Sequence, residues 1–272
     1  MTDVWTNLST PSPFELRQPG YSKTKRKAAS ATPAYECVGG KMVGYPHKLT
    51  HLAKKLDFLR DFLEAHPDRK FFITNRILPA SSGSGFCCVV FVYCKTLKEG
   101  HDAAFDKIHE NFWNGNDEYR NQRIKYLAQL PTAPFIVKSS VAALGGYKPV
   151  IMGRGYLVQK HYTGSNYIEV DVDITSSKVA RSISKAILAR SHVAVIDEGF
   201  VIEANEEDEL PERLLCSSRF IYTKTDRITT ALTPEMVTIS DDDSVLDEAN
   251  GGYTTDESME SIGSMEGSIG ST

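Results

Sequence analysis

Three carboxylates at alternate positions are the most distinctive chemical feature of this sequence. Glu169, Asp171 and Asp173 lie in the segment 166–174, where the alternate positions from 168 to 174 are all Ile or Val. Strict alternation predicts a β-strand with one polar and one apolar face. Alternate residues of a strand lie about 6 to 7 Å apart on one face, so three like charges there repel one another unless a partner neutralises them.

Two kinds of partner would neutralise this carboxylate ladder. A divalent cation binds several carboxylate oxygens at once, whereas Arg or Lys side chains form ion pairs with them. We favour ion pairs made by Arg123 or Arg219 over solvent exposure and over a metal or catalytic site; Arg120 and Arg181 are further candidates. The predicted polar cluster, structural or ligand-binding and without a metal ion, contains Arg123, Lys125, Glu169, Asp171, Asp173 and Arg219.

A hydrolytic site around the ladder is an alternative. His161 precedes the carboxylates, and Ser165, Ser176 and Ser177 are close to them in sequence. However, the chain has no GxSxG or HExxH motif and no phosphate-binding glycine loop with its Lys. The five cysteines lack zinc-ligand spacing. We therefore predict neither a catalytic residue nor a cofactor.

Charge is distributed unevenly along the chain. Residues 235–272 contain ten Asp or Glu and no Lys or Arg, which leaves 25 acidic against 31 basic residues in residues 1–234. This asymmetry indicates an anionic partner for the body of the protein, such as a membrane surface, a phosphorylated ligand or the chain's own acidic tail. Charge runs of this kind are more often simply solvated faces, and contact with lipid headgroups is the functional alternative. Nucleic acid is disfavoured because the basic residues are dispersed and no binding motif accompanies them. The candidate lipid contacts are Lys23, Lys25, Arg26, Lys27, Lys178, Arg181 and Lys185.

The pattern of apolar residues predicts about three amphipathic helices and a larger number of strands. Helices are expected over 49–63, from the capping box at 96–99 to near Gly115, and after Ser176 or Ser177. Strands are expected at 70–78, 86–95, 135–141, 150–162, 166–174 and 193–202, the first two pairing antiparallel, with a turn at 210–219 before a short apolar segment. The segment 117–130 is ambiguous.

This order of elements favours an α+β fold. Few strand–helix–strand units are complete, so a single domain built on a mainly antiparallel sheet is expected at 35–228. Residues 1–34 indicate an extended basic arm anchored by Trp5, Phe14 and Tyr21, and residues 235–272 a disordered acidic tail. No apolar run approaches the roughly 18 residues of a membrane span, and no signal sequence begins the chain. We expect a cytoplasmic protein, peripheral on membranes where it meets them.

Four segments, taken in order, resemble the C-terminal domain of the plant protein Enhanced Disease Resistance 2. Trp5, Phe14, Arg17 and Tyr21 resemble the opening "W … F-vRg--Y" of this family. The segment 119–125 with Pro131, followed by 135–138, resembles "fRn-RfKlIP … W-Vk", although 132–135 lacks the usual Gly-Trp pair. The segment 166–180 is similar to "nYlEvDvDi-sS-vA", and 208–215 with Arg219 to "eLPE-llG--R", with Cys216 where Gly is usual. The resemblance covers about residues 5–225.

The resemblance implies a lipid- or membrane-linked regulatory domain without established chemistry. Larger plant relatives carry this domain after a pleckstrin homology domain and a START lipid-binding domain. We therefore favour a non-enzymatic, lipid- or membrane-associated regulatory domain. The alternatives are a hydrolase or metal-dependent enzyme that uses the face of Glu169, Asp171 and Asp173, and a pure protein-interaction domain. An internal apolar cavity would support the first function, and convergence of the carboxylates with His161 on an open pocket would support the second.

Overall fold

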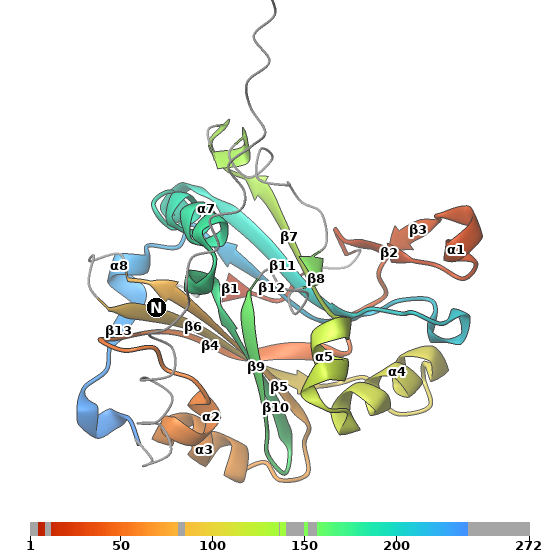
Figure 1. Cartoon of the computed structure of the whole chain (residues 1–272), viewed down its shortest axis with the longest axis horizontal. Helices are drawn as coiled ribbons and strands as arrows, with labels where there is room; N and C mark the ends of the chain where they lie inside the picture. Colours follow the sequence, from red (N-terminus) through yellow and green to blue (C-terminus); the bar gives the residue numbers. More distant parts are fainter. Residues whose placement is uncertain are drawn as a thin grey trace, which may run out of the picture. The chain divides into compact units, whose positions relative to one another are not determined.

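The computed structural model describes residues 5–8, 12–80, 85–135, 137–139, 150–151 and 157–238. The chain divides into two compact units, Met1–Val237 and Thr238–Thr272, and all described residues except Thr238 belong to the first. This unit is built on two antiparallel-dominated β-sheets with helices at their faces and edges (Figure 1). The α+β class expected from the sequence is thus confirmed.

The larger sheet has six strands in the order β13-β4-β6-β5-β10-β9. Their bounds are β13 Thr229–Ala231, β4 Tyr35–Tyr45, β6 Phe86–Lys95, β5 Phe71–Pro79, β10 Tyr167–Asp173 and β9 Val158–Thr163. The β5–β6 pair is antiparallel, as predicted, whereas β10 pairs with β5 in parallel and β13 with β4 in parallel. Parallel pairing of β10 with β5 leaves its polar face beside the helices that follow β4.

The smaller sheet has five antiparallel strands in the order β1-β12-β11-β7-β8. Their bounds are β1 Trp5–Thr6, β12 Leu214–Ile221, β11 Val195–Ile202, β7 Ile124–Thr132 and β8 Val150–Ile151. A separate hairpin, β2 Glu15–Arg17 and β3 Lys27–Ala29, encloses the helical turn α1 Tyr21–Thr24. The expected extended arm therefore contains a short hairpin.

The helices are short and lie between strands. They are α2 Leu52–Lys55, α3 Asp57–Glu64, α4 Ala103–Asn114, α5 Asp117–Arg123, α7 Lys178–Leu188 and α8 Thr225–Ile228. Single 3₁₀ turns occur at Ile174–Ser176, Ser191–Val193, Glu207–Glu209 and Pro234–Met236. No helix in the described ranges is long and apolar enough to cross a membrane.

Aromatic side chains from both sheets fill the main core. Phe72 and Phe91 of the larger sheet and Phe200 of the smaller one are buried in a single cluster, together with Phe112 of α4. Phe72 and Phe200 meet edge to face with ring centroids 6.1 Å apart, a geometry that adds about 0.5–1.5 kcal/mol beyond area burial. A second cluster lies between the larger sheet and α2–α3, and a third between the smaller sheet and the hairpin.

A buried ion pair also joins the two sheets. The guanidinium of Arg76 on β5 donates to the carboxylate of Glu198 on β11. Ser218 Oγ and Tyr126 Oη donate to the same carboxylate at 2.8 and 3.3 Å. Because the oxygens of Glu198 have three donors, the charge is compensated in the core, and removing any one donor would leave a buried charge underpaired.

Several expected boundaries are wrong for identifiable reasons. The helix expected over 49–63 breaks at Leu56, whose extended backbone forms a β-bridge with Val237. Asp102, not Thr96, caps α4, because its carboxylate accepts from the backbone N–H of Phe105.

Three further segments also differ from expectation. The ambiguous 117–130 segment is α5 followed by β7, and the turn expected over 210–219 becomes strand at Leu214. In the segment expected to be a strand at 135–141, residues 135 and 137–139 are helical. The N–H groups of Val137 and Lys138 donate to the carbonyl of Pro134, and Pro suits a first helical turn. Residues 140–141 lie outside the described part.

The first compact unit continues past Pro234. Val237 is 5% exposed and packs in the cluster of α2 and α3. The acidic tail, expected to begin at Glu235, therefore includes one core residue, Val237. Residues 239–272, for which disorder was also expected, lie outside the described ranges.

We predict that a chain ending at Pro234 is less stable than one ending at Thr238. Removing buried Val237 forfeits about 1–2 kcal/mol of apolar burial, which for this chain length lowers the thermal midpoint by about 4 °C. Differential scanning calorimetry of the two chains measures the difference. Val237→Ser in the full chain should reproduce the loss, whereas Met236→Ser, at a position 50% exposed, should not. Equal midpoints for the two truncated chains would contradict the role of Val237.

Candidate functional site

Two carboxylates of the ladder are buried at the start of α2. Glu169 Oε1 accepts from the N–H of Leu52 at 2.6 Å, and Glu169 Oε2 accepts from the N–H of Ala53 at 2.8 Å. Asp171 Oδ2 accepts from the N–H of His51 at 2.8 Å. The first N–H groups of a helix have no partner within the helix, so the two carboxylates provide the acceptors that this helix start needs. The predicted strand and its polar face are confirmed.

Burial affects the protonation of both carboxylates. Burial raises the pKa of Glu169, and burial together with the neighbouring Glu169 charge raises the pKa of Asp171 well above its usual range. The backbone donors favour the ionised form of Glu169, and the raised pKa of Asp171 favours its protonated form.

The arginines predicted to neutralise the ladder have other partners. Asp173 Oδ2 accepts from Lys48 Nζ at 2.8 Å. Arg219 forms a bidentate pair with Asp197 on the adjacent strand, with N···O distances of 2.6 and 2.8 Å. Arg123 contacts Glu209, as described below. The prediction that Arg123 or Arg219 neutralises Glu169 and Asp171 is thus wrong, because backbone N–H groups of α2 take that role.

The residues of the hydrolytic alternative do not converge. His161 pairs with Val170 across β9 and β10, so it lies on the face of the sheet opposite to Glu169 and Asp171. It packs near Phe112, and burial lowers its pKa to about 4. Ser176 and Ser177 are engaged locally: Ser176 Oγ donates to Asp173 O, and Ser177 caps α7. In the described ranges, no group of three His, Cys, Asp or Glu side chains is arranged to hold a metal ion.

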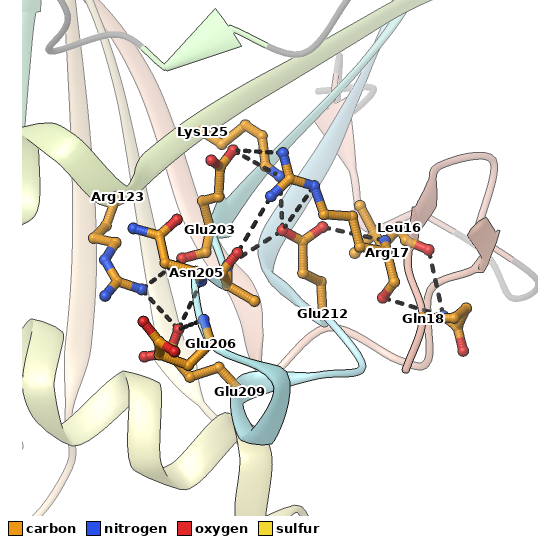
Figure 2. A network of polar contacts seen from close by, with 11 residues as sticks. Leu16, Arg17, Gln18, Arg123, Lys125, Glu203, Asn205, Glu206, Glu209 and Glu212 are labelled. Carbon is orange, nitrogen blue, oxygen red and sulfur yellow. Dashed lines mark hydrogen bonds and ion pairs between the residues drawn. The ribbon is translucent and has the colours of Figure 1, made fainter. Parts of the chain in front are cut away.

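A second polar network joins the hairpin to the smaller sheet (Figure 2). Lys125 of β7 donates to Glu212 at 2.7 Å and to Glu203 at 3.2 Å. The Arg17 guanidinium lies 3.3 Å from Glu203 and 3.9 Å from Glu212. The backbone N–H groups of Arg17 and Ala204 also donate to the Glu212 carboxylate, each at 3.2 Å. We call Arg17, Lys125, Glu203 and Glu212 the hairpin clasp.

Arg123 extends this network through the loop after β11. Its guanidinium donates to Glu209 at 2.8 Å and to the carbonyl of Glu203 at 3.0 Å. Glu209 also accepts from the N–H groups of Asn205 and Glu206. Although burial raises the pKa of Glu209, these donors lower it below its usual value, so the carboxylate stays ionised and holds the loop closed.

Apolar contacts support the clasp. Phe14 and Leu16 are buried against Val201 and Leu214. This close approach requires a glycine on β11, because a Cβ at Gly199 would lie 2.8 Å from Leu214 Cδ2 and 3.2 Å from Phe14 Cε2. A cavity of about 160 Å³ remains between hairpin and sheet, lined by clasp residues with Tyr21 and Lys27. The clasp therefore positions the hairpin on the sheet.

The predicted polar cluster is divided among three places. Lys125 belongs to the clasp and Arg123 to its extension. Glu169, Asp171 and Asp173 face the residues around α2, and Arg219 is paired within the smaller sheet. Sequence reasoning missed Arg17, Glu203, Glu209 and Glu212 as partners. A usable signal was present, because Arg17, Arg123, Lys125, Glu209 and Glu212 all lie in segments that carry the family resemblance.

The predicted lipid-contacting cations are on the surface in two groups. Lys23, Lys25, Arg26 and Lys27 are exposed at the hairpin, and Lys178, Arg181 and Lys185 are exposed on α7. Arg181 donates to the carbonyl of Thr175, and Lys25 Nζ lies 5.4 Å from the centre of the Tyr21 ring. Among the residues that the structure describes, no carboxylate lies within ion-pair distance of either group.

The segments that form these networks lie within the part of the chain that matches a known family. The sequence profile of the family described as "Protein ENHANCED DISEASE RESISTANCE 2, C-terminal" matches residues 5–224. A curated protein of Arabidopsis thaliana, "Protein ENHANCED DISEASE RESISTANCE 2-like", is 25% identical over 224 residues, which are 82% of this chain and 29% of that protein. The chain thus spans less than a third of the length of that relative. No solved structure matches the chain significantly.

We predict opposite responses to neutralising the two buried carboxylates. In Asp171→Asn, the amide preserves both the acceptor for His51 N–H and a donor toward Glu169, so the fold should tolerate it. In Glu169→Gln, the amide NH₂ faces the N–H of Leu52 or Ala53, which should cost about 1–3 kcal/mol. Chemical denaturation of both variants measures this contrast.

The same pair predicts a pH dependence of stability. Both folded-state pKa values are raised, so the contribution of the pair is complete below about pH 4, near the unfolded values. It is lost as pH rises through the raised folded-state pKa values. Asp171→Asn should therefore gain stability relative to the wild type as pH rises above about pH 4 toward the raised pKa of Asp171. A parallel pH dependence of the two proteins would contradict the assignment of the proton to Asp171.

We predict that Glu212→Gln weakens the hairpin clasp. The substitution leaves Lys125, whose side chain is 6% exposed, with one carboxylate fewer, and removing one partner of a buried pair costs about 3 kcal/mol. Hydrogen–deuterium exchange should increase first in residues 15–17 and 27–29. Asp208→Asn, which breaks an exposed pair with Lys107, is the matched control and should leave exchange there unchanged. Unchanged protection of the hairpin in Glu212→Gln would show that apolar packing alone holds it.

Proposed function

The chain belongs to the family of Enhanced Disease Resistance 2 C-terminal domains, and we propose that it is a non-enzymatic regulatory domain that binds anionic membrane surfaces from the cytoplasm. One observation carries this proposal. Two ordered elements of the fold carry exposed cations that have no carboxylate within ion-pair distance among the described residues. The hairpin and α7 each supply such a group.

The hairpin cations support the proposal because their positions are determined by buried contacts. The clasp and the Phe14–Leu16 contact hold the strands of the hairpin, and Gln18 N–H donates to Arg26 O at 3.1 Å. Lys23, Lys25 and Arg26 therefore lie on a short, closed turn. Less conformational entropy is lost when such side chains meet a charged surface than when a flexible chain does.

The helix α7 offers the second cationic surface. Its three basic residues are exposed, and none of its residues is fully buried. No Asp or Glu occurs from residue 174 to 196, so α7 itself carries only positively charged side chains. Each cation near an anionic membrane contributes about 1 kcal/mol, and screening over about 8 Å at physiological ionic strength makes binding weak and salt-dependent.

We predict that the full chain sediments with phosphatidylcholine vesicles containing phosphatidylserine at low salt, and less so at high salt. Lys23→Ala/Lys25→Ala/Arg26→Ala and Lys178→Ala/Arg181→Ala/Lys185→Ala each remove three charges, so each should reduce binding. A chain ending at Thr238 should bind more strongly, because the acidic residues after it compete with lipid for the cations.

The matched control removes three exposed charges elsewhere. Lys41, Lys54 and Lys98 are exposed, so Lys41→Ala/Lys54→Ala/Lys98→Ala has the same net charge as either test variant. If all three variants lose binding equally, net charge alone is responsible. If the chain ending at Thr238 stays in the supernatant at low salt, the membrane proposal fails and a protein-interaction role replaces it.

A further inference from the structure

Three exposed apolar side chains lie at one end of the smaller sheet. Phe135 is 86% exposed, Tyr222 is 52% exposed and Val193 is 42% exposed. They come from three different segments: the helical residues after β7, the residue after β12, and the 3₁₀ turn before β11. We call Phe135, Val193 and Tyr222 the strand-end rim.

Strand pairing brings these segments together. Val195, the first residue of β11, pairs with Thr132 at the end of β7 and with Ile221 at the end of β12. The N–H of Tyr222 donates to Ala194 O at 3.0 Å. Phe135, Val193 and Tyr222 each lie within three residues of these paired positions. The helix α7 ends at Leu188, seven residues before β11 begins at Val195.

Tyr222 is held in an unusual conformation. Its φ of 47° lies in the left-handed region, which non-glycine residues seldom adopt. The hydrogen bond from its N–H fixes the backbone, while Ser191 Oγ donates to the carbonyl of the next residue, Thr223, at 2.7 Å. The fold therefore constrains the backbone of a tyrosine whose side chain is half exposed.

Basic residues outnumber acidic ones near the rim in sequence: Lys138, Arg190 and Lys224 each lie within three residues of a rim residue, and Asp226 lies four residues after Tyr222. The sequence has no Asp or Glu from residue 119 to 168, nor from 174 to 196, and these stretches supply two of the three rim segments. Lys138, Lys185 and Arg190 are the cations of those stretches closest in sequence to the rim, and Lys185 and Arg190 are exposed. Apolar side chains flanked mainly by cations are complementary to a lipid interface: aromatic residues favour the headgroup level and cations favour anionic headgroups.

We propose that the strand-end rim inserts into the interfacial region of an anionic bilayer, with the cations of α7 against the lipid headgroups. This inference rests on the proposed membrane function and specifies the surface that enters the lipid. It makes α7, and not the hairpin, the cationic element nearest the membrane. The apolar contact adds a contribution to the binding free energy that salt does not screen.

Insertion is tested by the fluorescence of a tryptophan placed at the rim. In the full chain, Phe135→Trp should be quenched by vesicles of phosphatidylserine and brominated phosphatidylcholine. Phe58→Trp is the matched control, because Phe58 on α3 is 45% exposed and lies under Lys41 on the larger sheet. Its fluorescence should change no more than that of the wild type, which reports the native Trp5 and Trp113. Equal quenching at positions 135 and 58 would overturn the proposal.

Binding at high salt provides a second measurement. Phe135→Ser/Tyr222→Ser should lower the salt-resistant part of vesicle binding by about tenfold or more, the effect of losing partial burial of two aromatic rings. Phe58→Ser should leave it unchanged.

The outcomes separate this inference from the proposed function. If the wild type binds only at low salt and the Phe135→Trp variant is quenched no more than the wild type, the rim proposal fails while charge-driven membrane binding stands. If the wild type does not bind at any salt concentration, both fail. If the wild type self-associates without lipid and Phe135→Ser/Tyr222→Ser is monomeric, the rim is a subunit interface and the proposal is overturned.

Discussion

The position of the N-terminal hairpin on the smaller sheet depends on the hydrogen bonds of one buried carboxylate, that of Glu212. Its side chain is 1% exposed, yet it accepts from Lys125 Nζ and from the backbone N–H groups of Arg17 and Ala204. A carboxylate buried without such donors would cost several kcal/mol. The hairpin, β7 and the loop after β11 must therefore come together before Glu212 can be buried. The position of the hairpin cations is a consequence of that requirement.

The carboxylate ladder satisfies the same requirement with different donors. The start of α2 offers backbone N–H groups that lack partners within the helix, and they favour a nearby negative charge. Glu169 and Asp171 can thus be buried by accepting from this backbone, without an arginine. Because their oxygens point to α2 within the protein, while His161 lies on the other face of the sheet, the ladder is explained as a helix-capping device and gives no support to the hydrolytic alternative.

Short-period sequence patterns predicted the local elements of this protein well, but they did not predict which residues distant in sequence form pairs. Alternation of Ile and Val with carboxylates predicted β10 and its two faces, and Ser177 was a correct candidate for the cap of α7. The break at Leu56 was not predictable from the leucine period, because it depends on Val237, which is distant in sequence. Likewise, many basic residues could pair with a given carboxylate by charge alone. The register that places Arg219 beside Asp197, and the fold that brings Arg17 to Glu212, decide which pairs form.

The two cationic surfaces differ in what accompanies them, and this difference determines how each can act. At the hairpin, the cations surround a clasp whose own charges balance, since Arg17 and Lys125 face Glu203 and Glu212. Attraction there is electrostatic and fades with salt. After α7, the chain leads through exposed Val193 to the strand end where Phe135 and Tyr222 are also exposed. Apolar burial is insensitive to screening, and it requires direct entry into the lipid, so it also fixes orientation. A domain that carries both surfaces can be attracted to a membrane through either group of cations, but only the rim gives it a defined face toward the bilayer.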